Sequence, residues 1–207
     1  MKLLSVSRLR RSLYRLDFED GDPVEVDVRT FDESGFRQGS DLTEEQLNTL
    51  LATSQYNRAR ERALYLLGLR DYACKELEQK LYTEATPEVA AAVVERLREV
   101  GLLDDERYAA RLARSLSKIK HYPRRRIEQE LRHRGISSML IQTVLSELEG
   151  EDSEQALALL QKKYYNKLND PDSRRRAIAA LARRGFSYGS IRRAMDEMGA
   201  PDDEENT

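Results

Sequence analysis

The sequence RRRIEQELRHRGIS, residues 124–137, occurs a second time as RRRAIAALARRGFS, residues 174–187. The two copies are fifty residues apart, and the same offset relates positions beyond them, such as Ile141 and Ile191. An internal repeat of this period indicates an architecture of similar supersecondary units. The fold can therefore be predicted from one unit and its copies.

Each copy predicts a helix, a glycine turn and a second helix. Ile127 and Leu131 lie four residues apart, so both fall on one face of a helix. Gly135 can adopt the left-handed conformation that ends a helix, and Ser137 can cap the next helix by accepting an amide hydrogen bond. The equivalent residues of the other copy are Ala177, Leu181, Gly185 and Ser187.

A more divergent third copy lies upstream. In the run KELEQKL, residues 75–81, Leu77 and Leu81 precede Ile127 and Leu131 by fifty residues. Its turn has no glycine, and Thr86-Pro87 provides the next helix start, because proline is tolerated at the first position of a helix. We therefore expect three repeats of three helices each.

The expected fold class is mainly α: an elongated curved array of three tandem three-helix repeats, preceded by a small N-terminal antiparallel β-sheet. A helical triplet cannot bury its own apolar face, so the repeats must stack on their neighbours. The expected divisions are a sheet extension at 1–42, repeat one with its lead-in helix at 43–103, repeat two at 104–150, repeat three at 151–199, and an acidic disordered tail at 200–207.

Local signals place several boundaries. Apolar alternation predicts strands at about 3–9, 12–18 and 24–28, and we interpret the basic turn 8–11 as an ordinary exposed loop. Thr43 and Gln46 have capping-box spacing, which predicts a helix running to about Leu69. The longest break is expected at 166–173, before the second arginine run.

Composition argues against secreted and membrane proteins. The 207 residues contain one cysteine, which cannot form an internal disulfide and fits a reducing compartment. No apolar run approaches the roughly 20 residues of a membrane span, and the apolar part of MKLLSVSRLRR is too short for a signal peptide. We expect a cytoplasmic monomer without membrane contact.

Signals for catalysis are poor. There are two histidines, His121 and His133, and no HExxH, CxxC, GxxxxGK[ST] or GxGxxG pattern. The usual zinc and nucleotide signatures need such spacings. We expect no enzyme, and no catalytic, metal-ligating or cofactor-binding residues.

The charge is segregated although the net charge is only -2. Residues 118–134 hold seven Lys or Arg against two Glu, and residues 174–193 hold seven Arg and no acid. Such segregation creates a local field that a near-neutral total conceals. We predict a partner-binding or DNA-binding surface, to which we add Tyr188 as a contact residue. The candidate residues are Lys118, Lys120, Arg124, Arg125, Arg126, Arg132, Arg134, Arg174, Arg175, Arg176, Arg183, Arg184, Tyr188, Arg192 and Arg193.

The alternative is that these arginines coat solvated helix faces and pair with acids three or four residues away. At 124–134 the two interpretations are evenly matched. At 174–193 pairing is less favoured, because that range contains no acid.

The segment GLLDDERYAARLARS, residues 101–115, followed by RIEQELRHRGIS, residues 126–137, resembles the middle of RecX regulatory proteins. KELEQKL resembles the first-repeat helix of that family, and the sheet region with GFRQGSDLT, residues 35–43, resembles an extension of many Gram-positive-type members. The resemblance covers about residues 1–198. Two departures are Ala73, where the family often has serine, and Tyr122, where it often has glycine.

The resemblance implies a protein that binds the RecA recombinase filament along its groove. Such proteins contact successive RecA subunits and weaken the ATP hydrolysis, strand exchange and coprotease activity of RecA. They thereby regulate recombinational DNA repair and the SOS response. DNA would be a weak partner, met mainly within the filament. Two other functions stay open: a sequence-independent DNA-binding helical-repeat protein, and a scaffold for unrelated partners.

Overall fold

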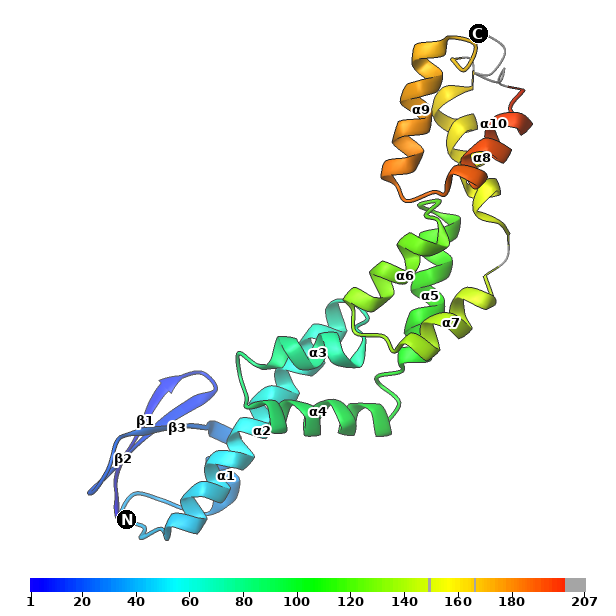
Figure 1. Cartoon of the computed structure of the whole chain (residues 1–207). Coiled ribbons are helices and arrows are strands. Elements are labelled where there is room, and N and C mark those ends of the chain that lie inside the picture. The colour runs from blue at the N-terminus through cyan, green and yellow to red at the C-terminus, as the bar shows by residue number, and fades with distance from the viewer. Residues whose placement is uncertain (149, 166, 200–207) are drawn as a thin grey trace. The chain divides into compact units, whose positions relative to one another are not determined.

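The computed structural model describes residues 1–148, 150–165 and 167–199, which form three strands and ten helices (Figure 1). The predicted acidic tail at 200–207 lies outside the described residues. The chain divides into two compact units, one ending at Asp104 and the other beginning at Asp105. The predicted fold class is confirmed in its elements: a small antiparallel sheet followed by three helical triplets.

The sheet has the strand order β1-β2-β3, with antiparallel pairing throughout. Its strands are β1 (Leu3–Arg10), β2 (Leu13–Phe18) and β3 (Val24–Asp27). Alternate residues of β2 point inward, so Leu16 and Phe18 are buried with Val26 of β3. A hydrophobic core forms between these residues, Phe31 and Leu50. The three predicted strands are therefore confirmed to within two residues.

Two features near the sheet differ from the sequence-based expectation. Residues 8–10 are not a loop but the end of β1, and only residues 11 and 12 form the turn. The helix α1 (Val28–Ser34) was not predicted. It begins where the buried Asp27 accepts a 2.9 Å hydrogen bond from the backbone N–H of Thr30, and such capping favours helix initiation.

The long helix α2 (Glu44–Leu69) belongs to two cores. Its start has the predicted capping box, with Thr43 Oγ1 accepting from the Gln46 amide and the Gln46 side chain accepting from the Thr43 amide. Leu47 and Leu50 pack in the core of the sheet, whereas the second half of α2 packs in the core of repeat one. The predicted link between sheet and repeats is therefore confirmed.

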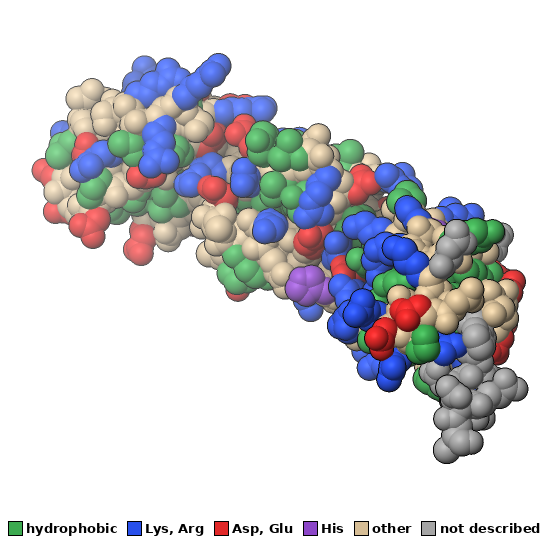
Figure 2. Space-filling view, turned by 90° about the horizontal axis from the view of Figure 1, so that it is seen from above, with side chains coloured by type: hydrophobic (Ala, Val, Ile, Leu, Met, Phe, Trp, Pro, Cys, Tyr) green, Lys and Arg blue, Asp and Glu red, His purple; other side chains and the backbone are tan. Residues whose placement is uncertain are grey.

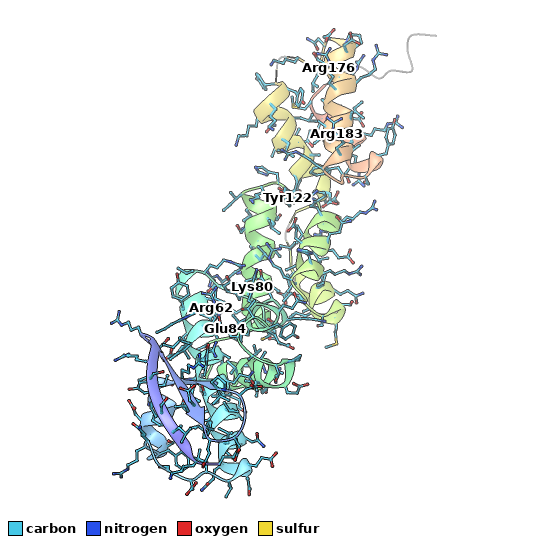
Figure 3. All side chains as sticks on the ribbon, turned by 90° about the vertical axis from the view of Figure 1, so that its left-hand side faces the viewer. Arg62, Lys80, Glu84, Tyr122, Arg176 and Arg183 are labelled. Carbon is cyan, nitrogen blue, oxygen red and sulfur yellow. The ribbon has the colours of Figure 1, made fainter. Side chains whose placement is uncertain are left out.

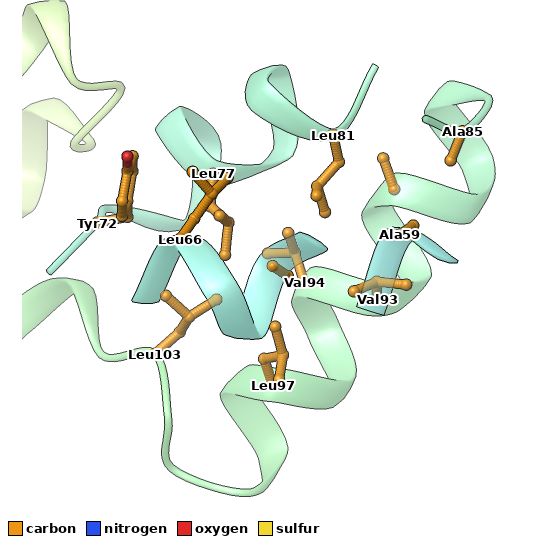
Figure 4. Packing of buried hydrophobic residues seen from close by; sticks show 12 residues of the cluster. Ala59, Leu66, Tyr72, Leu77, Leu81, Ala85, Val93, Val94, Leu97 and Leu103 are labelled. Atoms are coloured by element: carbon orange, nitrogen blue, oxygen red, sulfur yellow. The ribbon is translucent and has the colours of Figure 1, made fainter. Parts of the chain in front are cut away.

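Repeat one is completed by α3 (Cys74–Leu81) and α4 (Pro87–Glu99). Leu77 and Leu81 are fully buried, as the fifty-residue offset predicts. Figure 4 shows Leu77 and Leu66 facing Val94 and Leu97 across the core formed by α2, α3 and α4.

Repeats two and three have the same helix pattern within the second unit. Their helices are α5 (Asp105–Lys118), α6 (Arg124–His133), α7 (Ser138–Ser146), α8 (Asp152–Tyr164), α9 (Pro171–Arg183) and α10 (Tyr188–Glu197). In Figure 1, α8, α9 and α10 lie together as the last triplet.

The duplicated glycine turn has the same hydrogen bond in both repeats. The Ile136 N–H donates to the Leu131 carbonyl at 3.2 Å, and the Phe186 N–H donates to the Leu181 carbonyl at 3.3 Å. The glycine between each pair has a positive φ, 80° in repeat two and 95° in repeat three, as this helix-ending motif requires. The predicted serine caps of α7 and α10 are also present.

The break before α9 is shorter than predicted. Helix α9 begins at Pro171, three residues before the arginine run, and Asp170 caps it by accepting a 2.8 Å hydrogen bond from the Ser173 N–H. Hydrogen bonds from the side chain and backbone of Ser173 lower the pKa of Asp170. The Asp-Pro pair therefore starts a helix here, since proline lacks an N–H that the first turn would leave unbonded.

The junction between repeats two and three is built around the start of α6. The Asp152 side chain accepts a 2.9 Å hydrogen bond from the Arg124 backbone N–H. The Arg124 guanidinium donates to the carbonyls of Leu148 and Gly150, at 2.7 and 3.0 Å. His121, with a positive φ of 52°, places its Nδ1 3.0 Å from Oε1 of Gln155.

We expect Leu131→Ala and Leu181→Ala to lower the free energy of unfolding by similar amounts, about 2–5 kcal/mol each, because both leucines are buried at equivalent positions. Urea denaturation followed by circular dichroism measures this. Met139→Ala, at a side chain that is 80 % exposed, is the control and should change stability little. Markedly unequal losses would contradict the structural equivalence of the repeats.

We expect Arg124→Ala to lower the free energy of unfolding of the second unit by about 1–2 kcal/mol, because two backbone carbonyls lose a charged donor. Arg125→Ala removes an exposed neighbouring arginine and is the matched control. Hydrogen exchange should show faster exchange around residues 150–155 in the first variant only. Equal exchange rates around residues 150–155 in the two variants would exclude a stabilising role of the Arg124 side chain at the repeat junction.

Candidate partner-binding surface

The arginine runs 124–126 and 174–176 each contain one side chain that points inward and at least one that points to solvent. The first arginine of each run points inward: Arg124 is half-buried at the junction, and Arg174 is only 8 % exposed. Both were predicted to lie on a binding surface, and the structure instead makes Arg174 a packed residue of α9. The cause is helical periodicity, since Arg174 lies three residues before the buried Ala177 and so shares its face.

Three of the remaining four arginines of the two runs are exposed. Arg125, Arg175 and Arg176 are exposed, whereas Arg126 is half-buried. The Arg126 guanidinium lies 5.2 Å from the centre of the Tyr122 ring, which is a cation–π distance. The fifty-residue repeat therefore presents arginines to solvent at equivalent positions of α6 and α9.

Ion pairs occupy the basic face of α6. Arg132 and Arg134 pair with the glutamates four residues before them, Glu128 and Glu130, at 2.6 and 3.0 Å. Burial lowers the pKa of Arg134, but hydrogen bonds with Glu130 and Tyr108 outweigh that effect, so its pKa is raised. The pairing alternative is thus confirmed for much of 124–134.

The basic range 174–193, which covers parts of α9 and α10, also contains ion pairs. Asp172 pairs with Arg175 at 3.1 Å, and Glu151 pairs with Arg193 at 2.7 Å. Asp172 and Glu151 both lie outside residues 174–193, which is why the absence of acids within that range did not exclude ion pairs. Asp172 is available because α9 begins at Pro171, which places this carboxylate in the first turn.

Several predicted contact residues are exposed on helices of the second unit. Arg176 and Arg183 are seven residues apart on α9, which is close to two helical turns, so they share one face. Figure 3 shows both side chains on this helix. Tyr188, the first residue of α10, is 73 % exposed, and Arg184 is half-buried. Lys118, Lys120, Arg132, Arg192 and Arg193 are exposed as well.

Two hollows were not predicted from the sequence. A hollow of about 310 Å³ is lined by Lys118, Arg114 and Glu147, so one candidate residue lies in a polar depression. A cavity of about 430 Å³ lies between α1 and α2 and is lined in part by Phe36 and Leu50. Neither has a sequence signature, because each depends on how helices pack.

Within the described residues, no three His, Cys, Asp or Glu side chains come together as metal ligands would. His121 instead faces Gln155, and His133 is exposed. None of the helices described is long and apolar enough to span a bilayer. The exposed candidates are arginines, two lysines and one tyrosine, and guanidinium groups can bind anions through charge-assisted hydrogen bonds.

Whether these residues contact a partner stays a prediction. Basic side chains are spread over the second unit, and Figure 2 shows Lys and Arg on the face seen there, with acidic side chains among them. Of the fifteen candidates, the structure gives Arg124 and Arg174 clear structural roles and leaves most others exposed.

Comparison with known proteins places all three repeats in one family. The RecX first, second and third three-helix domains match residues 59–97, 104–145 and 150–195. Regulatory protein RecX of Streptococcus sanguinis is 26 % identical over 100 % of this chain and 80 % of its own length. Regulatory protein RecX of Trichlorobacter lovleyi is 36 % identical over 65 % of this chain and 92 % of its own length.

Solved structures of similar fold agree. A crystal structure of regulatory protein RecX superposes with a TM-score of 0.64 over 94 % of this chain and 98 % of its own, at 22 % identity. The crystal structure of RecX from Lactobacillus salivarius gives a TM-score of 0.62 over 71 % of this chain and 98 % of its own, at 20 % identity. With three domain matches in order and a 36 % identical relative covered over nearly all its length, this chain belongs to the RecX family.

Proposed function

We propose that this protein binds the RecA nucleoprotein filament along its groove and restrains RecA. The observation that carries the proposal is the match of three successive domains to the RecX family. By holding neighbouring RecA subunits, the protein would slow the motions between them that ATP hydrolysis and strand exchange require. It would thereby regulate recombinational DNA repair, coprotease activity and the SOS response.

Repetition supports binding to a polymer rather than to a single subunit. Each three-helix repeat can contact one filament subunit weakly, and linked weak contacts add up to avidity. The recurrence of Arg125 and Arg126 as Arg175 and Arg176 would bring similar groups to successive subunits. Free RecA monomers would then bind more weakly than the filament.

Electrostatics would supply a second contribution. The filament contains DNA, and guanidinium groups contact phosphate through charge-assisted hydrogen bonds. Arg176 and Arg183 on α9 are suited to this, because both are exposed and, within the described residues, neither forms an ion pair. This attraction should weaken as salt rises.

We expect the triple variant R175E/R176E/R183E to bind RecA filaments roughly tenfold or more weakly at low salt, because three attractive charges become repulsive. Co-sedimentation with RecA on single-stranded DNA measures this. R29E/R96E/R98E reverses three exposed arginines outside the candidate surface and should bind as the parent does. Unchanged binding in the α9 variant would remove the electrostatic contribution.

The same comparison tests the alternative of a plain DNA-binding protein. A mobility shift on bare DNA is run beside co-sedimentation with the filament. The proposed function requires tighter binding to the filament than to the same DNA without RecA. Equal affinity would favour the sequence-independent DNA-binding alternative.

We expect Tyr188→Ala to weaken filament binding about three- to tenfold while leaving the unfolding midpoint unchanged, because aromatic contact residues contribute strongly to interfaces and this ring is 73 % exposed. Tyr165→Ala is the matched control, since its ring is 72 % exposed and lies outside the candidate set. Equal effects of the two substitutions would show that Tyr188 has no particular role.

A further inference from the structure

The hairpin formed by β1 and β2 ends in a strongly basic segment. Residues 8–15, which we call the basic hairpin tip, contain Arg8, Arg10, Arg11 and Arg15 and no acidic residue. All four arginines are exposed. Figure 2 shows Lys and Arg side chains projecting from the face of the sheet-bearing unit seen there. This cluster lies outside the helical repeats.

Three of these four charges are not compensated by an acid. Arg15 pairs with Asp17 at 2.9 Å, whereas no acidic side chain in the described part of the chain pairs with Arg8, Arg10 or Arg11. Arg8 donates instead to the Arg11 carbonyl, at 2.8 Å. Elsewhere in the same unit, exposed arginines such as Arg29 do hold a glutamate. Uncompensated positive charge at one tip creates a site for an anion.

The tip belongs to the three-stranded sheet, in which β3 pairs with residues 13–16 of β2 and β1 is on the other side. β1 is an edge strand, and residues 39 and 40 cover only its beginning: the Gly39 N–H donates to the Leu3 carbonyl at 2.8 Å, and the Leu3 N–H donates to the Ser40 carbonyl at 2.9 Å. The pairing register between β1 and β2 shifts between Arg8 and Arg10, so the strand is irregular at its end. Irregularities such as β-bulges change the direction in which side chains point. Leu9, at the shift, is 44 % exposed.

We propose that the basic hairpin tip binds the phosphate backbone of duplex DNA. Arginine side chains contact the phosphate oxygens of a duplex through charge-assisted hydrogen bonds, and such contacts need no particular base sequence. Duplex DNA also presents a dense and regular row of negative charge, which exposed arginines without an acidic partner can bind.

The composition of the tip favours duplex over single-stranded DNA. Proteins that bind single strands usually offer aromatic rings on which bases stack. The one aromatic residue of the tip, Tyr14, is half-buried, with its ring 5.6 Å from that of Phe31 in an edge-to-face arrangement. No ring in residues 8–15 is therefore available as a stacking platform.

The tip could instead protect the sheet edge. Charged side chains and bulges on edge strands prevent association with the strands of other molecules. This role predicts that removing the arginines promotes self-association and leaves DNA affinity unchanged. Binding to DNA predicts the reverse, so one variant separates the two.

The site goes beyond the proposed function, because it concerns bare duplex DNA and not RecA. The variant is R8Q/R10Q/R11Q, in which three exposed charges are lost and the apolar core of the sheet is untouched. Fluorescence anisotropy of a labelled duplex of about two helical turns, titrated with full-length protein between about 50 and 200 mM salt, measures the affinity and its salt dependence.

We expect the variant to bind this duplex roughly tenfold or more weakly at low salt, and the slope of log K against log salt to fall in magnitude by about 3, close to one unit per lost phosphate contact. Single-stranded DNA of the same sequence should show a smaller loss. Circular dichroism and sedimentation velocity confirm that the variant is folded and monomeric to the same extent as the parent.

The charge-matched control is R29Q/R96Q/R98Q, which removes three exposed arginines of the same unit that pair with glutamates. An equal loss of affinity in this control would show that only net charge matters and would overturn the proposal. So would an unchanged affinity of the tip variant, with or without self-association. Filament binding of the α9 variant is a separate readout, so either idea can fail alone.

Discussion

Repeats two and three depend on how their second helices, α6 and α9, end. At Gly135 and Gly185 the backbone takes a positive φ, and the next amide bonds back to a leucine carbonyl, from Ile136 to Leu131 in the first case. This turn directs the chain into a third helix that covers the same leucines. Because a three-helix unit has a small core, a turn of a different shape would expose the residues that hold it together.

The same periodicity that builds the core also assigns the arginines their roles. In a helix whose inward residues are set by Ile127 or Ala177, the first arginine of the run falls on the buried side and the next falls on the exposed side. A run of like charges is therefore not one functional group. Arg124 binds backbone carbonyls at the repeat junction, and Arg125 is exposed to solvent.

An arginine that forms an ion pair is less available to a partner than an arginine without an acidic neighbour. Glu128 and Glu130 largely balance the basic face of α6, so a partner there must compete with existing ion pairs. On α9, Arg176 and Arg183 form no ion pair within the described residues, and Arg8, Arg10 and Arg11 of the hairpin tip have no acidic partner there, so both surfaces are the ones we propose for anionic partners. The two proposed sites belong to separate units of the chain, so each can be altered without the other.

The sequence alone determined the repeats, the serine caps of α7 and α10 and the small sheet, because periodicity, glycine and capping residues act within a few positions of the chain. It also determined the family, since the joined motif at residues 101–137 is specific. Only the tertiary structure decided that Arg174 is buried, that Asp172 pairs with Arg175, and that residues 8–10 extend a strand. These outcomes depend on where α9 begins and on how strands pair, which are set by packing and by hydrogen bonds between distant segments.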